Sequence, residues 1–179
     1  MGTALKPKPV KLIVGLIFGQ ERLLHQAEEA LKRKFGPIDF QSPILDFSCH
    51  TDYYEKELGK GLRRKFISFE KLIQPDSLAK IKLLANRIEL QLSRKTGKNK
   101  PSRRVNIDPG YLDMAKLVLA TTKDFAHRIY LGKGIFAEVT LCYQKDSYRA
   151  REWTYPDYRT SQYIETFNRI RQLYNRQIC

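Results

Sequence analysis

The alternation of apolar and polar residues predicts strands and helices in turn along the chain. Lys11–Phe18 is almost entirely apolar, which is typical of a central strand. Apolar residues at helical spacing predict helices at 20–35, 75–95 and 161–176. Alternating or extended segments predict further strands at 38–47, 63–69, 103–107, 117–122, 127–131, 135–143 and 148–153. The turn sequence Asp108-Pro109-Gly110 is expected to break the strand before it.

The first part of this order is strand, helix, strand, strand, helix, strand, which matches the ferredoxin-like βαββαβ unit. We therefore predict one α+β domain over residues 1–179, with residues 1–8 as a flexible lead-in. Its sheet is expected to be mixed but largely antiparallel, with extra C-terminal hairpin strands and a C-terminal helix. No run of 18 apolar residues occurs, so no membrane-spanning helix is predicted.

Charge is concentrated in one quarter of the chain. The sequence has 33 Lys and Arg against 19 Asp and Glu, a net charge of +14, and residues 59–104 hold 14 basic and 3 acidic side chains. Such an excess attracts polyanions, although a well-solvated basic surface without a partner is an equal alternative. The candidate phosphate contacts are Lys60, Arg63, Arg64, Lys80, Arg87, Arg94, Arg103 and Arg104.

A hairpin turn at Gly132-Lys133-Gly134 assigns the faces of two strands. One face is apolar and carries His127, Ile129, Leu131, Ile135, Ala137, Val139 and Leu141. The other face carries Arg128, Tyr130, Phe136, Glu138 and Thr140. Two interpretations stay open for the second face: a simple Arg128–Glu138 ion pair beside a buried His127, or a polar pocket lined by Arg128, Tyr130, Glu138 and Thr140.

Three further segments carry candidate chemistry, each with a structural alternative. Asn106 and Asp108 share one side of an extended chain, so they could hold a metal or a hydroxyl group, or Asp108 could only cap a turn. Thr121, Thr122 and Lys123 follow a strand and suit either a phosphate or a plain turn. The aromatic residues of 153–158 either plug one end of the sheet or stack on bases.

Several mechanisms lack their sequence patterns. The P-loop pattern, G-x-G-x-x-G, G-x-S-x-G and H-E-x-x-H are all absent. The scattered Cys and His residues do not have zinc-site spacing, and no cofactor is indicated. They are Cys49, Cys142, Cys179, His25, His50 and His127. Three cysteines cannot all pair, so we expect a reducing cytoplasm.

Seven short motifs spread over nearly the whole chain carry a family resemblance. They are NIDPGYL at 106–112, RIYL at 128–131, FAEVTL at 136–141 and WTYPDY at 153–158, with PVKL at 9–12, TDYY at 51–54 and SFEKL at 68–72. Together they resemble a bacterial domain of unknown function, family 4416. The resemblance implies a cytoplasmic, single-domain bacterial protein, and it implies no activity.

Three functions from different classes are therefore expected as alternatives. The first is a basic binding module for RNA or another phosphate-rich ligand, held by the candidate phosphate contacts. The second is a hydrolase or transferase acting on a phosphorylated small molecule. In it, Asp108 and Glu138 are the catalytic groups or metal ligands, and Arg128 and Lys123 hold the anion. The third is a non-enzymatic scaffold or subunit, with exposed aromatic residues on a partner.

Overall fold

The computed structural model describes residues 2–48, 55–93 and 102–179. Its strands are β1 (Lys11–Phe18), β2 (Ile38–Gln41), β3 (Leu45–Asp46), β4 (Arg63–Phe69), β5 (Val105–Leu112), β6 (Lys116–Thr121), β7 (Ile129–Gly132), β8 (Ile135–Gln144) and β9 (Ser147–Ala150). Its helices are α1 (Glu21–Phe35), α2 (Glu55–Leu58), α3 (Leu78–Leu92) and α4 (Ser161–Ile178), with 3-10 turns η1 (Pro75–Ser77) and η2 (Asp157–Arg159).

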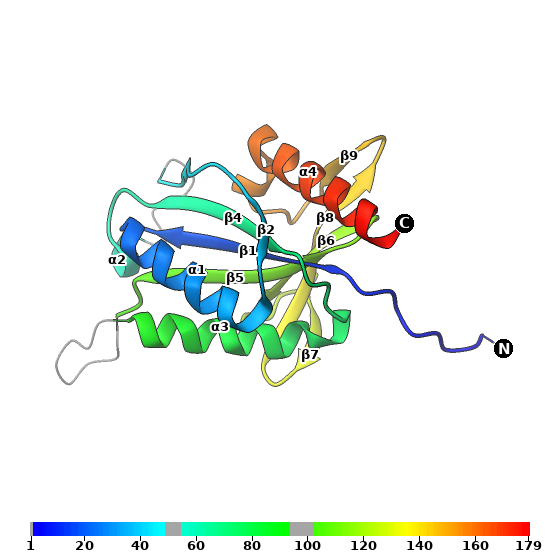
Figure 1. Cartoon of the computed structure of the whole chain (residues 1–179), viewed down its shortest axis with the longest axis horizontal. Coiled ribbons are helices and arrows are strands. Elements are labelled where there is room, and N and C mark those ends of the chain that lie inside the picture. The colour runs from blue at the N-terminus through cyan, green and yellow to red at the C-terminus, as the bar shows by residue number, and fades with distance from the viewer. Residues whose placement is uncertain (1, 49–54, 94–101) are drawn as a thin grey trace.

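The strands form one sheet in the order β2-β4-β1-β5-β6-β8-β7, with β3 on β4 and β9 on β8 (Figure 1). Every pairing between these strands is antiparallel. The fully buried β1 lies between β4 and β5, as its apolar sequence predicts. The order β2-β4-β1-β5 is that of a βαββαβ unit, so the predicted α+β class and its ferredoxin-like start are confirmed.

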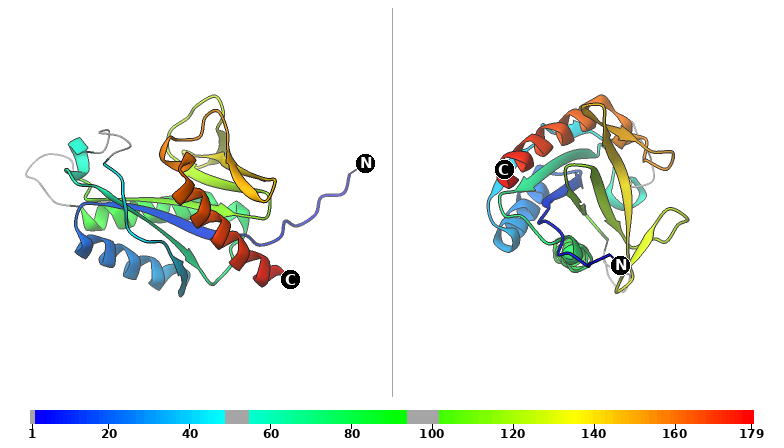
Figure 2. Two further views of the ribbon diagram at one scale, coloured as in Figure 1. Left: turned by 90° about the horizontal axis from the view of Figure 1, so that it is seen from above. Right: turned by 90° about the vertical axis from the view of Figure 1, so that its right-hand side faces the viewer.

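Helices cover both faces of this sheet. Helices α1 and α3 pack on one face around Leu12, Leu16 and Ile67, whereas α4 packs on the other around Ile13 and Phe66 (Figure 2). The residues of β1 that face α1 and α3 alternate with those that face α4, because successive strand residues point to opposite faces. In the part of the chain that is described, no helix is both long and apolar enough to cross a membrane.

The predicted break at Asp108-Pro109-Gly110 is wrong, because β5 runs through it without interruption. The backbone N and O of Ile107 point away from β1, and at a period of two residues those of Pro109 do the same. The missing N–H of Pro109 therefore costs no bond with β1. Gly110 is required because a Cβ there would lie 2.4 Å from the carbonyl oxygen of Val118.

The face assignment of the predicted hairpin is wrong in part, because β8 contains a bulge. Leu117 pairs with Leu141, but Val118 pairs with Val139, so Thr140 has no partner on β6. A bulge reverses the faces on either side of it. Ile135 and Ala137 therefore pack on the α3 side, and Leu141 packs on the α4 side.

A second irregularity affects the edge strand β7. Ile129 faces Ala137 and Tyr130 faces Phe136 as predicted, but Gly132 rather than Leu131 pairs with Ile135. Ile129 is 71% exposed, so the expected apolar face does not continue across β7.

Candidate functional site

A cavity of about 520 Å³ lies where the sheet opens between β5 and β6. The pairing of these strands stops at Gly110 and Leu119, and β5 continues beyond this point without β6. The cavity is lined by Phe47, Arg64, Lys82, Arg103, Asn106, Asp108, Leu119, Ala120, Thr121, Thr122, Lys123, Glu138, Tyr155, Pro156, Asp157 and Tyr158. Residues from the sheet, from α3 and from the segment before α4 thus meet in one place.

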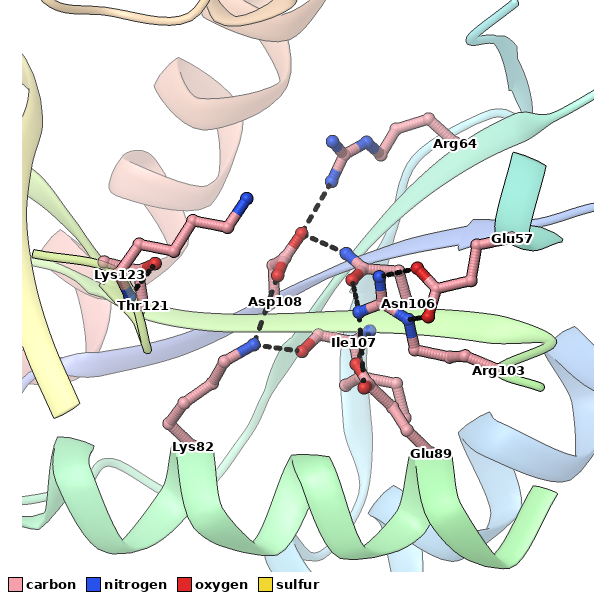
Figure 3. Close-up of polar contacts among 10 residues, drawn as sticks. All are labelled: Glu57, Arg64, Lys82, Glu89, Arg103, Asn106, Ile107, Asp108, Thr121 and Lys123. Atoms are coloured by element: carbon pink, nitrogen blue, oxygen red, sulfur yellow. Dashed lines mark hydrogen bonds and ion pairs between the residues drawn. The ribbon is translucent and has the colours of Figure 1, made fainter. Parts of the chain in front are cut away.

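Two side chains of α3 replace β6 along the open edge of β5 (Figure 3). Lys82 Nζ donates to the carbonyl oxygen of Ile107 at 2.9 Å and to Asp108 Oδ1 at 3.2 Å. Glu89 Oε1 accepts the N–H of Ile107 at 2.6 Å, and burial raises the pKa of Glu89. Lys82 and Glu89 lie two helical turns apart on one face, so a single helix satisfies both groups of Ile107.

Asp108 is the carboxylate that the cavity exposes, with 24% of its side chain accessible. Its Oδ2 accepts from Asn106 Nδ2 and lies 3.7 Å from Arg64 Nη1. Burial opposes ionisation, but Lys82 and Arg64 outweigh it and lower the pKa of Asp108. Asp108 therefore stays charged at neutral pH.

A chain of hydrogen bonds orients Asn106 beneath Asp108. Arg103 Nη1 donates to Asn106 Oδ1 at 2.6 Å, which turns the amide nitrogen of Asn106 toward Asp108. Arg103 is itself held by the carboxylate of Glu57, at 2.6 and 3.1 Å. Neither Asn106 nor Asp108 shows the arrangement expected of metal ligands, since Lys82 and the Asn106 amide donate to the Asp108 oxygens and Arg103 donates to the Asn106 oxygen.

Arg64 is the most buried cation of the site, with 3% of the residue exposed. Its guanidinium lies 4.9 Å from the ring centre of Phe47, 5.4 Å from that of Phe66 and 5.6 Å from that of Tyr158. A Cβ on Gly15 would come within 2.7 Å of Arg64 Nη1, so the bare backbone of β1 makes room for the guanidinium. Burial opposes the charge of Arg64, but neighbouring acidic groups outweigh it and raise its pKa.

Two polar side chains on the cavity wall have unused hydrogen-bonding capacity. Arg64 Nη2 donates to Asp157 Oδ2 at 3.2 Å, but Arg64 Nε, Arg64 Nη1 and the hydroxyl of Tyr158 find no hydrogen-bond partner among the described residues. These atoms are closed to solvent, so each unmade bond costs about 1–3 kcal/mol. All of them can donate, which suits a ligand rich in acceptor oxygens.

Glu138 forms the wall of the cavity beyond β6, and it is only 3% exposed. Its Oε2 accepts from Arg128 Nε at 2.8 Å and lies 3.1 Å from His127 Nε2, and its Oε1 is 3.4 Å from the hydroxyl of Thr140. The cross-strand Arg128–Glu138 pair is therefore present. Because its oxygens are engaged, Glu138 is suited to position its neighbours rather than to react.

The aromatic residues of 153–158 lie at the cavity or next to it. Arg128 Nη2 donates to the hydroxyl of Tyr155 at 2.6 Å, and Tyr155 remains 42% exposed. Trp153 stacks on His127 at 5.3 Å between ring centres, and its Nε1 donates to the carbonyl oxygen of Val139. Sequence analysis left open whether these rings plug the sheet or stack on bases, and the structure treats them differently. Tyr158 is buried in the core, whereas Trp153 and Tyr155 are exposed.

Comparison with known proteins identifies the family. The model of one family, Domain of unknown function (DUF4416), matches residues 8–174. The chain belongs to this family. No curated protein and no solved structure matches it. The described part of the DUF4416 domain contains no group of three His, Cys, Asp or Glu residues that could hold a metal ion.

The DUF4416 fold brings some of the predicted site residues together. Asp108, Glu138, Asn106, Arg64, Arg103 and Lys123 all line the cavity. The side chain of Lys123 extends from the end of β6 toward the space above Asp108 (Figure 3). Arg128 reaches the site through Glu138 and Tyr155. Tyr130 packs on Phe136 and Thr140 is buried behind Glu138, so neither of them lines the cavity.

The predicted cationic surface is only partly present. Arg64 is buried, and Arg63 pairs with Glu21 at 2.6 Å. Arg104 is half-buried and donates to Gln20. Lys60, Lys80 and Arg87 are exposed, and Arg94 lies outside the described residues.

Sequence analysis missed Lys82, Glu89 and Asp157 as members of the site. Lys82 and Glu89 border the apolar stripe of α3 that contains Ile81, Ala85 and Ile88. Charged residues at the edge of a buried helix face need polar partners there, but their spacing alone does not separate Lys82 and Glu89 from the exposed Lys80 and Arg87. Asp157 carried no signal either, because only the fold brings it to Arg64.

Proposed function

We propose that this DUF4416 domain binds a phosphorylated small molecule in the cavity between β5 and β6. The observation that carries the proposal is that Arg64 and Tyr158, two residues of the cavity lining, hold donors without a hydrogen-bond partner among the described residues, namely Arg64 Nε, Arg64 Nη1 and the Tyr158 hydroxyl. Buried polar groups without partners are rare, and a ligand is one of the few reasons to keep them.

The surroundings of these donors favour phosphate. Lys82 and Lys123 line the same cavity, together with the hydroxyl groups of Thr121 and Thr122. Guanidinium, ammonium and hydroxyl donors are the usual partners of phosphate oxygens. Arg64 Nη1 lies 3.7 Å from Asp108 Oδ2, which is too long for a hydrogen bond, so a ligand oxygen that accepts from Nη1 does not have to replace one.

The size of the cavity favours a small molecule. Pockets for drug-sized ligands span roughly 300–1,000 Å³, and about 520 Å³ lies within that range. The Arg64 side chain is buried in the lining of the cavity, whereas the phosphate backbone of a nucleic acid is normally bound by exposed cations. Free thiols at Cys142 and Cys179 support the further proposal of a cytoplasmic location.

Calorimetric titration of the full chain with a panel of phosphorylated metabolites tests the binding proposal. We expect Arg64→Met and Lys123→Ala each to weaken binding by about 10- to 100-fold, because each removes a charged donor. Lys123 is exposed at the end of β6, so its variant leaves the core intact. Arg63→Met is the matched control, because Arg63 lies outside the cavity. Unchanged affinity in both site variants contradicts the proposal.

A second candidate function is that of a hydrolase or transferase in which Asp108 is the catalytic group that acts on the bound molecule. Asp108 favours it, because this charged carboxylate is exposed to the cavity that holds the anion donors. Glu138 then acts as a positioning residue. Turnover of a bound compound, followed by phosphorus NMR, is expected in the wild type and lost in Asp108→Asn. Binding without turnover in the wild type removes this candidate and leaves the first.

A further inference from the structure

We propose that the phosphorylated molecule is a nucleotide, whose base stacks on the ring of Tyr155 while its phosphate is held by the cationic side chains that line the same cavity. This inference rests on the proposed function and names the ligand class of the same cavity. Tyr155 is part of the cavity lining and is 42% exposed, so a large part of the residue is open to a ligand. Exposed aromatic rings beside a cationic site are the usual platform for nucleobases.

The ring of Tyr155 is fixed before any ligand arrives. Its hydroxyl accepts from Arg128 Nη2 at 2.6 Å. Arg128 is anchored in turn by Glu138 at 2.8 Å and by the carbonyl oxygen of Lys123 at 3.0 Å. Binding therefore does not have to immobilise the Tyr155 side chain, which removes an entropic cost of stacking. The Arg128–Glu138 pair, predicted from the sequence as a possible pocket wall, thereby acquires a role in presenting this ring.

Tyr155 and Arg64 both lie near the ring of Tyr158. The ring centre of Tyr158 lies 6.4 Å from that of Tyr155 and 5.6 Å from the guanidinium of Arg64. The stacking surface of Tyr155 and the cation Arg64 therefore belong to one cavity and share Tyr158 as a neighbour. A nucleotide carries its base and its phosphate on one sugar, and the Thr121 and Thr122 hydroxyls, which also line the cavity, can pair with sugar oxygens.

Among the residues that the structure describes, the remaining exposed aromatic side chains do not offer this combination. Phe125 and Tyr130 are exposed, but neither lines the cavity. Trp153 already stacks on His127 and is absent from the cavity lining. Within the described ranges, Tyr155 is therefore the exposed ring that lines the cavity. Trp153, the only tryptophan of the chain, lies two residues away in the sequence and serves as a spectroscopic probe.

Calorimetry on the full chain with adenosine monophosphate, uridine monophosphate, ribose 5-phosphate and inorganic phosphate tests the inference. We expect a nucleoside monophosphate to bind about tenfold or more tightly than ribose 5-phosphate, because a stacked base adds free energy that the sugar phosphate lacks. Quenching of Trp153 fluorescence by the nucleotide gives a second readout.

Variants of the platform complete the experiment. Tyr155→Ala is expected to bring nucleotide affinity down to that of ribose 5-phosphate, whereas Tyr155→Phe keeps most of it because the ring remains. Tyr130→Ala, an exposed tyrosine outside the cavity, is the control and should change nothing. Equal affinity for nucleotide and ribose 5-phosphate, or an unaffected Tyr155→Ala variant, overturns the nucleotide inference alone. Failure of all four compounds to bind overturns both this inference and the proposed function.

Discussion

At the scale of single residues, the site is an arrangement of buried charges that balance one another. Arg64 lies between Asp157 and Asp108, and Asp108 lies between Arg64 and Lys82. Taking charges out of water is costly unless each has a partner. The arrangement therefore couples the ionisation of Asp108 to the stability of the fold.

Asp108→Asn is expected to lower the free energy of unfolding by about 3 kcal/mol at pH 7, because it removes one partner of buried cations. The folded-state pKa of Asp108 lies below the ordinary value of 3.8. The stability it contributes is present above that value and is lost as pH falls through the folded-state pKa. The difference between wild type and Asp108→Asn should therefore shrink below pH 4. Urea unfolding between pH 2 and 7 measures it.

The exposed Asp124 provides the control for this pH series. Asp124→Asn should match the wild type in stability at every pH. A difference between Asp108→Asn and wild type that stays constant from pH 7 to pH 2 would show that the Asp108 carboxylate is not held by its cations.

At the scale of elements, the site depends on the end of the β5–β6 pairing. Strand β5 keeps its backbone bonds to β1 but exchanges β6 for the side chains of α3. Without Glu89 the buried N–H of Ile107 would have no acceptor. An unpaired backbone group in the interior costs about as much free energy of folding as the loss of a hydrogen bond. Helix α3 therefore stabilises the opening rather than merely covering it.

Substitution of Glu89 separates its hydrogen bond from its charge. Glu89→Leu is expected to destabilise the domain by about 2 kcal/mol, because the Ile107 N–H loses its acceptor. Glu89→Gln keeps an oxygen acceptor and removes a charge whose burial is unfavourable, so this variant should lose clearly less stability than Glu89→Leu. Chemical denaturation of both variants makes the comparison. Equal losses would mean that the contact with Ile107 contributes little.

The elements also show where sequence analysis reaches its limit. Periodicity located β1, α1 and β4 almost to the residue, since each has a continuous buried stripe. It misplaced the turn at Asp108-Pro109-Gly110, because turn propensity ignores that the proline nitrogen can face an open strand edge. It also misassigned Leu141, because simple alternation along a strand takes no account of the bulge at Thr140, which reverses the faces.

The candidate site was predicted in the same uneven way. Asp108, Asn106 and Lys123 were recognised by their residue types near strand ends, and they do meet in the cavity. The partners that define their chemistry come from remote segments. Lys82 lies 26 positions from Asp108 and Asp157 lies 93 positions from Arg64. Only the topology of the sheet brings these groups into contact.

At the scale of the whole molecule, the net charge of +14 is divided between two settings. Some cations are internal or paired, such as Arg64, Lys82 and Arg63. Others, such as Lys60, Lys80 and Arg87, are exposed. The first set supports the small-molecule proposal. The second leaves RNA as a separate proposal that uses a different surface.

Salt dependence separates the two proposals. If RNA binds the exposed surface, its affinity should fall with salt, with a logarithmic slope of about −0.7 per phosphate neutralised on a single strand. Removing two exposed cations in Lys80→Ala/Arg87→Ala should then reduce the slope by about 1.4. Arg64→Met should leave RNA affinity unchanged, because Arg64 is buried, but it should weaken binding of the phosphorylated small molecule. A filter-binding series between 50 and 300 mM salt on the three proteins measures both effects. If no RNA is retained at the lowest salt, the proposal of RNA binding on the exposed surface is excluded. The proposal for the cavity is unaffected, because the two proposals depend on different cations.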